Sequence, residues 1–181
     1  PKMPRYKKSD LTTVIITNQD AVLYQDDIGM SLKLPLQKQR LYFSNLSSDP
    51  VLKEVKIKPY YGRFLLCLTL EEPDVAFDPS GSHVCAIDLG TDNFAAIVCD
   101  DHSSAIYKGG AVLSKSQWFH KQRAKYVSII TKGQEKKHAV SKRLRDLSFH
   151  YANFVKDQCH KISRSIIDFC MEHQCGTLIL G

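Results

Sequence analysis

The first part of the chain has the pattern of polar and apolar positions that predicts short β-strands. Residues 11–18 are rich in β-branched side chains, and short alternating runs follow at 24–36 and 40–43. Such runs, bounded by polar turns, are typical of strands. A polar segment marked by proline and glycine then follows at 71–81. We therefore expect a mostly β domain over residues 1–82 and a second domain over residues 83–181.

The clearest element of the first domain is a predicted hairpin. Valine and isoleucine alternate with lysine at 55–58, a turn is expected at 59–62, and an apolar run returns at 64–70. The alternation predicts one buried face and one basic, solvated face. The residues that could contact RNA by charge and stacking are Lys56, Lys58, Tyr60 and Arg63. An ordinary aromatic turn is the alternative interpretation.

The pattern changes after residue 82. Three apolar runs, at 84–89, 94–99 and 105–107, are separated by short polar turns and predict an antiparallel meander. A helical period then begins near Ser114, a residue type that commonly caps a helix N-terminus, and continues to about residue 130.

The strongest periodic signal lies between residues 141 and 173. Apolar positions there recur every three or four residues: Leu144, Leu147, Tyr151, Val155, Cys159, Ile162, Ile166 and Cys170. This spacing predicts one helix roughly 50 Å long with a single apolar face. Cys175 and Gly176 are expected to end it, and residues 177–180 have the pattern of a buried strand. The order of elements predicts an α/β (α+β) fold whose second domain begins like a ribonuclease H-like domain.

A single carboxylate stands at the end of the first run of the meander. Aliphatic residues lead directly into Asp88, and Gly90 permits a sharp turn immediately afterwards. A carboxylate held rigidly at a strand end suits a divalent metal such as magnesium, or a phosphate. The alternative is that Asp88 only caps the turn. Asp92, Asp100 and Asp101 lie in turns, where aspartate is common for structural reasons.

The charge of the chain is unevenly distributed. The 181 residues carry a net charge of +6, and between residues 114 and 145 ten basic residues face one acid, Glu135. A basic stripe attracts polyanions, although a solvated helix face is the alternative. Further candidates for nucleic-acid contact are Lys121, Arg123, Lys142, Arg145, Asn153, Lys156, His160, Lys161 and Arg164. Trp118 and Phe119 either stack on bases or anchor their helix to the core.

The six cysteines suggest free thiols in a reducing compartment. None of them has C-x-x-C spacing, and several lie in apolar strand patterns, where a reduced cysteine behaves as a small hydrophobic residue. We therefore expect neither disulfides nor a zinc site, and a cytoplasmic protein. No apolar stretch reaches membrane-spanning length, so no membrane partner is expected.

Residues 86–93, A-I-D-L-G-T-D-N, resemble a segment of two families. One is the superfamily of actin and heat-shock-protein ATPases. The other is the TnpB family of transposon-encoded, RNA-guided endonucleases, relatives of the type V CRISPR effectors. The surrounding sequence favours TnpB. Stretches that resemble TnpB in the right order are 1–8, 17–19, 55–70, 142–145, 153–163 and 176–180.

The TnpB resemblance implies a partial, β-barrel-like wedge domain at 1–82, which binds guide RNA. An incomplete RuvC nuclease domain with long inserted helices follows at 83–181. In TnpB this domain cuts DNA with Mg2+ or Mn2+ held by Asp, Glu and a second Asp, and Asp88 matches the first. The Glu position holds Gly181, and the later Asp and the zinc finger are absent.

The resemblance therefore suggests a fragment that has no nuclease activity by itself. Its implied partners are guide RNA and target DNA, and its place is the nucleoid in the cytoplasm. The edge strand at 177–180 invites self-association. Two alternatives stay open: a non-catalytic nucleic-acid-binding module of ribonuclease H-like fold, and an actin-like ATPase.

Overall fold

The computed structural model describes residues 11–26, 29–43, 50–71, 81–132 and 141–181. The chain forms two compact units, Pro1–Ala76 and Phe77–Gly181. The division falls a few residues before the domain boundary that the sequence suggests. Each unit is described below by itself.

The first unit contains two three-stranded antiparallel sheets. Strands β1 (Val14–Thr17), β5 (Val51–Tyr60) and β6 (Arg63–Glu71) form one sheet in that order. Strands β2 (Val22–Asp26), β3 (Gly29–Lys33) and β4 (Leu41–Phe43) form the other. Both sheets contribute to one core, whose buried members are Ala21, Leu32, Leu34, Leu52 and Val55. The shared core explains why such short strands are stable together.

The predicted hairpin is present, with a tighter turn than expected. Strands β5 and β6 pair as far as Tyr60 and Arg63, so that only Tyr61 and Gly62 form the turn. Both have a positive φ, 48° and 79°, as a two-residue hairpin turn requires. Pro59 fits within β5 because, among the described residues, the pairing of β5 with β1 ends at Ile57.

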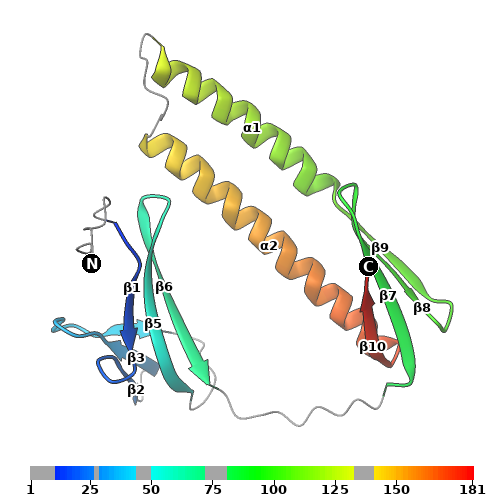
Figure 1. The fold of residues 1–181 in the computed structure, drawn as a ribbon, viewed down its shortest axis with the longest axis horizontal. Coiled ribbons are helices and arrows are strands. Elements are labelled where there is room, and N and C mark those ends of the chain that lie inside the picture. Colours follow the sequence, from blue (N-terminus) through cyan, green and yellow to red (C-terminus); the bar gives the residue numbers. More distant parts are fainter. Residues whose placement is uncertain (1–10, 27–28, 44–49, 72–80, 133–140) are drawn as a thin grey trace, which may run out of the picture. The chain divides into compact units, whose positions relative to one another are not determined.

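The second unit contains a four-stranded sheet in the order β10-β7-β8-β9 (Figure 1). Strands β7 (His83–Leu89), β8 (Asn93–Cys99) and β9 (Ser104–Lys108) form the predicted antiparallel meander. Strand β10 (Cys175–Leu180) lies parallel to β7. The α+β class is therefore confirmed, whereas the wedge and RuvC assignments stay predictions.

Two long helices, α1 (Gly110–Thr131) and α2 (Lys142–Glu172), connect β9 to β10 and lie side by side (Figure 1). The rings of Phe119 and Tyr151 stack between them, with centroids 4.1 Å apart and planes at 8°. The last turns of α2 cover one face of the sheet, where Cys170 joins Cys85, Ile87, Ala95, Ile97 and Cys99 in the core. Ser141 caps α2, since its side chain accepts a hydrogen bond from the Leu144 amide.

Four details of the sequence interpretation were wrong. Residues 177–180 are not a buried strand, because all four are exposed in β10. Ser114 is not an N-cap, because α1 already begins at Gly110. Gly109 precedes it, and its amide donates to the Asp92 carbonyl at 2.9 Å, so the helix starts directly at the end of the meander. Cys175 does not end a helix: α2 ends at Glu172, and Cys175 is the first residue of β10.

The fourth error concerns the apolar face of α2. Most of its predicted members are buried or half-buried, but Cys159 is exposed. It lies between Phe154, whose ring is close to Lys115 of α1, and Ser165, whose carbonyl accepts a hydrogen bond from Tyr107 of β9. Among the described helices none is both long and apolar enough to cross a membrane.

Candidate carboxylate site and basic surfaces

Strand β7 places Asp88 on the open face of the sheet. Cys85 and Ile87 point into the core beneath α2, and successive side chains alternate between the two faces of a strand. Asp88 therefore lies on the opposite face, where it is exposed and pairs across the sheet with Ala96 of β8. The turn that follows is tight, since a Cβ atom on Gly90 would lie 3.0 Å from the Asn93 carbonyl oxygen.

Gly181 lies beside Asp88. Leu180 pairs with Ile87 in the parallel register, and the Gly181 amide donates to the Ile87 carbonyl at 2.9 Å. One residue further along the two strands, Gly181 lies opposite Asp88. A side chain at 181 would lie on the same face as Asp88, because neighbouring residues in register share a face of the sheet.

The other acids of the meander lie elsewhere. Asp100 accepts from the Val84 amide at 3.1 Å, which places it near the start of β7, at the opposite end from Asp88. Asp101 accepts from the Ser103 amide at 2.8 Å within its own turn. Asp92 lies in the exposed turn before β8. Asp88 belongs to no group of three close metal-ligating side chains within the ranges that the structure describes.

Most of the candidates for nucleic-acid contact on α2 form an exposed stripe along the helix. Lys142, Arg145, Asn153, Lys156, His160 and Arg164 are all exposed and recur at helical spacing. Two of the predicted cations have acidic partners one turn away: Lys161 Nζ lies 2.7 Å from Asp157, and Arg164 Nε lies 2.9 Å from Asp168. The Lys161 ammonium lowers the pKa of the Asp157 carboxyl below its ordinary value. The described residues offer Lys142, Arg145 and Lys156 no such partner.

The two aromatic candidates of helix α1, Trp118 and Phe119, differ in their exposure to solvent. Phe119 is 7% exposed and stacks on Tyr151, so it anchors the helix. Trp118 is 46% exposed, with the Lys115 ammonium 4.3 Å from its ring centroid. Trp118 thus keeps an accessible aromatic surface, and the exposed Lys121 lies one turn further along the helix. Arg123 is also exposed.

The hairpin candidates belong to the first unit. Lys58 and Arg63 are exposed, and Lys56 and Tyr60 are half-buried. Lys56 forms an ion pair with Glu54 on the same strand. The rings of Tyr60 and Tyr61 meet edge to face at 4.8 Å, which orders the aromatic tip of the hairpin.

Two histidine–aspartate pairs at the far end of the sheet were missed by the sequence analysis. His83 Nδ1 lies 2.7 Å from Asp100, and His173 Nδ1 lies 2.8 Å from Asp101. The hydrogen bonds from Ser103, followed by that from His173, hold the pKa of Asp101 well below its usual range. The pKa of Asp100 is lowered mainly by His83 and the Val84 amide. The two members of each pair are 17 and 72 positions apart in the sequence, so no local spacing predicts the pairs.

Comparison with known families decides the assignment. A family model described as a probable transposase, OrfB_IS605, matches residues 67–181. The chain belongs to the OrfB_IS605 transposase family. This agrees with the TnpB resemblance on which the sequence analysis relied. The match includes Asp88, both long helices and β10, and no curated protein matches the chain.

Proposed function

We propose that this OrfB_IS605 chain is a nucleic-acid-binding part of a TnpB-like, RNA-guided DNA endonuclease. In this proposal residues 83–181 are the first part of a RuvC-type, ribonuclease H-like domain, and residues 1–82 are part of a wedge domain that binds guide RNA. The observation that carries the proposal is the placement of Asp88 on the open face of a sheet beside a parallel strand, in a chain of this family. Guide RNA and target DNA in the nucleoid would be its partners.

The ligand set for a metal-dependent nuclease is incomplete among the described residues. Two-metal hydrolysis of a phosphodiester needs several carboxylates around ions about 4 Å apart. Asp88 supplies a suitable hard oxygen ligand, but Gly181 beside it supplies no side-chain ligand. One carboxylate does not fit two ions, so we derive no hydrolysis step and expect the chain alone to be inactive.

A nicking assay tests that expectation. Supercoiled plasmid is incubated with the protein and Mg2+ or Mn2+, alongside an Asp88→Ala variant. We expect no cleavage above background with either protein. Cleavage by the unmodified protein that disappears in Asp88→Ala would overturn the expected inactivity and support a metal site completed by another source.

The binding part of the proposal rests on the α2 stripe. Cations without acidic partners contact phosphates, and each such contact contributes roughly one unit to the slope of log affinity against log salt. A gel-shift assay with structured RNA at several salt concentrations should therefore give strongly salt-dependent binding. Replacing Lys142, Arg145 and Lys156 by alanine should weaken binding and reduce this slope by about two to three units.

A matched control is available on the same helix. Lys161→Ala and Arg164→Ala remove cations that already have acidic partners, so together they should change the slope less. Equal losses for the two sets would contradict the assignment of the binding surface. Absence of RNA and DNA binding by the unmodified protein would contradict the proposed function itself.

A further inference from the structure

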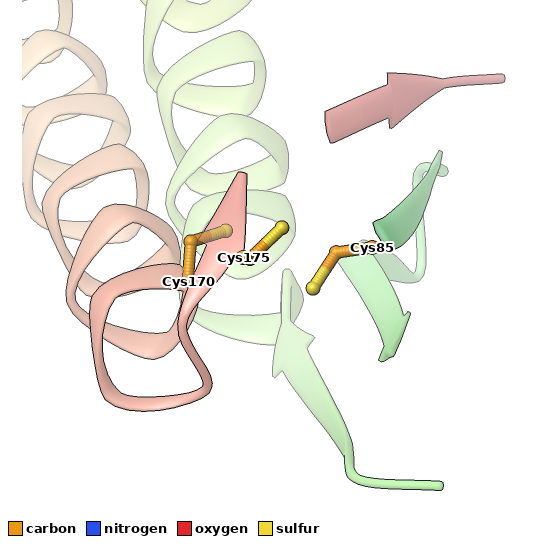
Figure 2. A group of neighbouring side chains, drawn as sticks. All are labelled: Cys85, Cys170 and Cys175. Carbon is orange, nitrogen blue, oxygen red and sulfur yellow. The ribbon is translucent and has the colours of Figure 1, made fainter. Parts of the chain in front are cut away.

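Three cysteines from three different elements converge in the second unit. Cys85 lies on β7, Cys170 in the last turn of α2 and Cys175 at the start of β10. Figure 2 shows their side chains directed toward one another, and the three sulfur atoms all lie within 4.8 Å of each other. In a zinc–thiolate centre with bonds of about 2.3 Å, the sulfurs are about 4 Å apart. Small side-chain adjustments would therefore bring all three onto one ion.

The cluster lies at the boundary between the core and the surface. Cys85 is 0% exposed and Cys170 is 8% exposed, whereas Cys175 is half-buried and so partly accessible to solvent. Cys85 also pairs across the sheet with Cys99, which is another buried thiol. The Cys175 thiol donates to the Thr177 carbonyl at 3.0 Å, so it is already held in a defined direction.

Two thiols of this cluster, those of Cys85 and Cys170, have a raised pKa and are kept protonated in the free protein. Burial, followed by the neighbouring thiols of Cys175 and Cys99, raises the pKa of Cys85 far above its ordinary value. Burial and Cys175 likewise raise the pKa of Cys170. Such thiols are poor nucleophiles, which argues against a catalytic or redox-sensing role. A soft cation, by contrast, binds the sulfurs by displacing their protons.

From this convergence we propose that Cys85, Cys170 and Cys175 form a binding site for a soft, thiolate-preferring cation of the Zn2+ class. Soft sulfur ligands select such ions over Mg2+. On binding, three S–H bonds are lost, three metal–sulfur bonds form and three protons are released to solvent, while an external ligand such as water completes the coordination. The ion would tie the end of α2 to β7 and β10. This revises the expectation of no zinc site, which rested on sequence spacing alone.

Cadmium is a suitable probe, because its bonds to thiolates give a charge-transfer absorption band in the ultraviolet. The fully reduced chain is titrated with Cd2+ in a thiol-free buffer, and Zn2+ is then added as competitor. We expect the band to saturate at one Cd2+ per chain and to disappear on addition of Zn2+. Binding should strengthen as the pH rises, because the displaced protons are then released more easily.

Cysteine variants distinguish binding at the three-cysteine cluster from non-specific binding by other thiols of the chain. Cys175→Ser changes a half-buried ligand and should weaken Cd2+ binding by about a hundredfold or more, as should Cys170→Ala. Cys159→Ser changes an exposed cysteine outside the cluster and should bind like the unmodified chain. Circular dichroism checks that each variant is folded. If Cys175→Ser does not fold, Cys170→Ala is used to test the site. A titration without saturation, or equal loss in Cys159→Ser, would overturn the proposal.

Discussion

Gly81 and Gly176 lie so close together that neither has room for a Cβ atom. A Cβ on Gly176 would overlap the carbonyl oxygen of Gly81, and one on Gly81 would overlap the backbone of Gln174 and Gly176. This contact brings the segment before β7 against the first residues of β10. Cys175, a member of the cysteine cluster, lies between Gln174 and Gly176 within this contact.

Substitution of Gly176 should therefore destabilise the second unit. Gly176→Ala places a methyl group against backbone atoms that cannot rotate away, and we expect the free energy of unfolding to fall by about 1–3 kcal/mol. Urea denaturation monitored by circular dichroism measures this. The control is Gly110→Ala, at the first position of α1, where nothing lies within 4 Å of the added Cβ. That change should be neutral or stabilise the protein by up to about 1 kcal/mol, and an equal loss in both variants would argue against the backbone contact.

Asp101 should make the stability of the second unit sensitive to acid. Its pKa is lowered in the folded chain by Ser103 and His173, so the unfolded state takes up this proton more readily than the folded state. The stabilisation is complete above the unfolded pKa of about 4 and is lost as the pH falls from there toward the lower folded value.

Urea midpoints measured between pH 7 and pH 2.5 test this dependence on Asp101. The midpoint of the unmodified protein should fall steeply below about pH 4. The midpoint of Asp101→Asn should be lower at pH 7 and should fall less on acidification. Ser103→Ala removes the hydroxyl that donates to the Asp101 carboxylate and should be intermediate. If Asp101→Asn keeps the full acid-induced loss, the carboxylate is not responsible for it.

Phe119 and Trp118 should behave differently although they are adjacent. Phe119→Ala removes the ring that stacks on Tyr151 in the α1–α2 interface and should cost about 3 kcal/mol of stability or more. Trp118→Ala changes an exposed ring and should alter stability by less than about 0.5 kcal/mol. Thermal unfolding compares the two. A large loss in Trp118→Ala would show that its ring also anchors the helix.

A carboxylate at position 181 should create a stronger cation site with Asp88. A Cβ atom there would lie 3.4 Å from the Ile87 carbonyl oxygen, which is an ordinary contact, so Gly181→Glu should fold normally. Two carboxylates on one sheet face bind a hard divalent cation better than one, and we expect Mn2+ affinity to rise at least about tenfold. Calorimetric titration measures it. Gly181→Gln has nearly the same shape as Gly181→Glu but no charge, so its Mn2+ affinity should not rise. Equal Mn2+ affinities of the two variants would contradict the placement of residues 88 and 181 on one face of the sheet.

Much of the second unit follows from local sequence patterns. The alternation before Asp88 defines β7, and the spacing of apolar residues by three or four defines α2 over nearly its whole length. Ser141 is the expected starting point of α2 and is its cap. These features depend on neighbours within a few residues, which is the range that a sequence pattern describes.

Features that depend on distant contacts could not be found in this way. Helix α1 begins four residues before Ser114 because Gly109 is held against Asp92. The pattern around Trp118 and Phe119 did not show which ring faces α2, since that depends on the rotation of α1. The convergence of Cys170 and Cys175 on Cys85 requires β10 to pair with β7, and no spacing between cysteines reveals it.

The parallel pairing of β10 with β7 also has a consequence for the order of folding. Cys175 pairs with His83, about ninety residues earlier, whereas the meander and the α1–α2 hairpin are built from contacts between successive elements. Closing so long a segment costs chain entropy before any hydrogen bond to β7 compensates for it. Strand β10 should therefore join the sheet last and leave it first, and its amides should exchange with solvent hydrogen before those of β7 and β8.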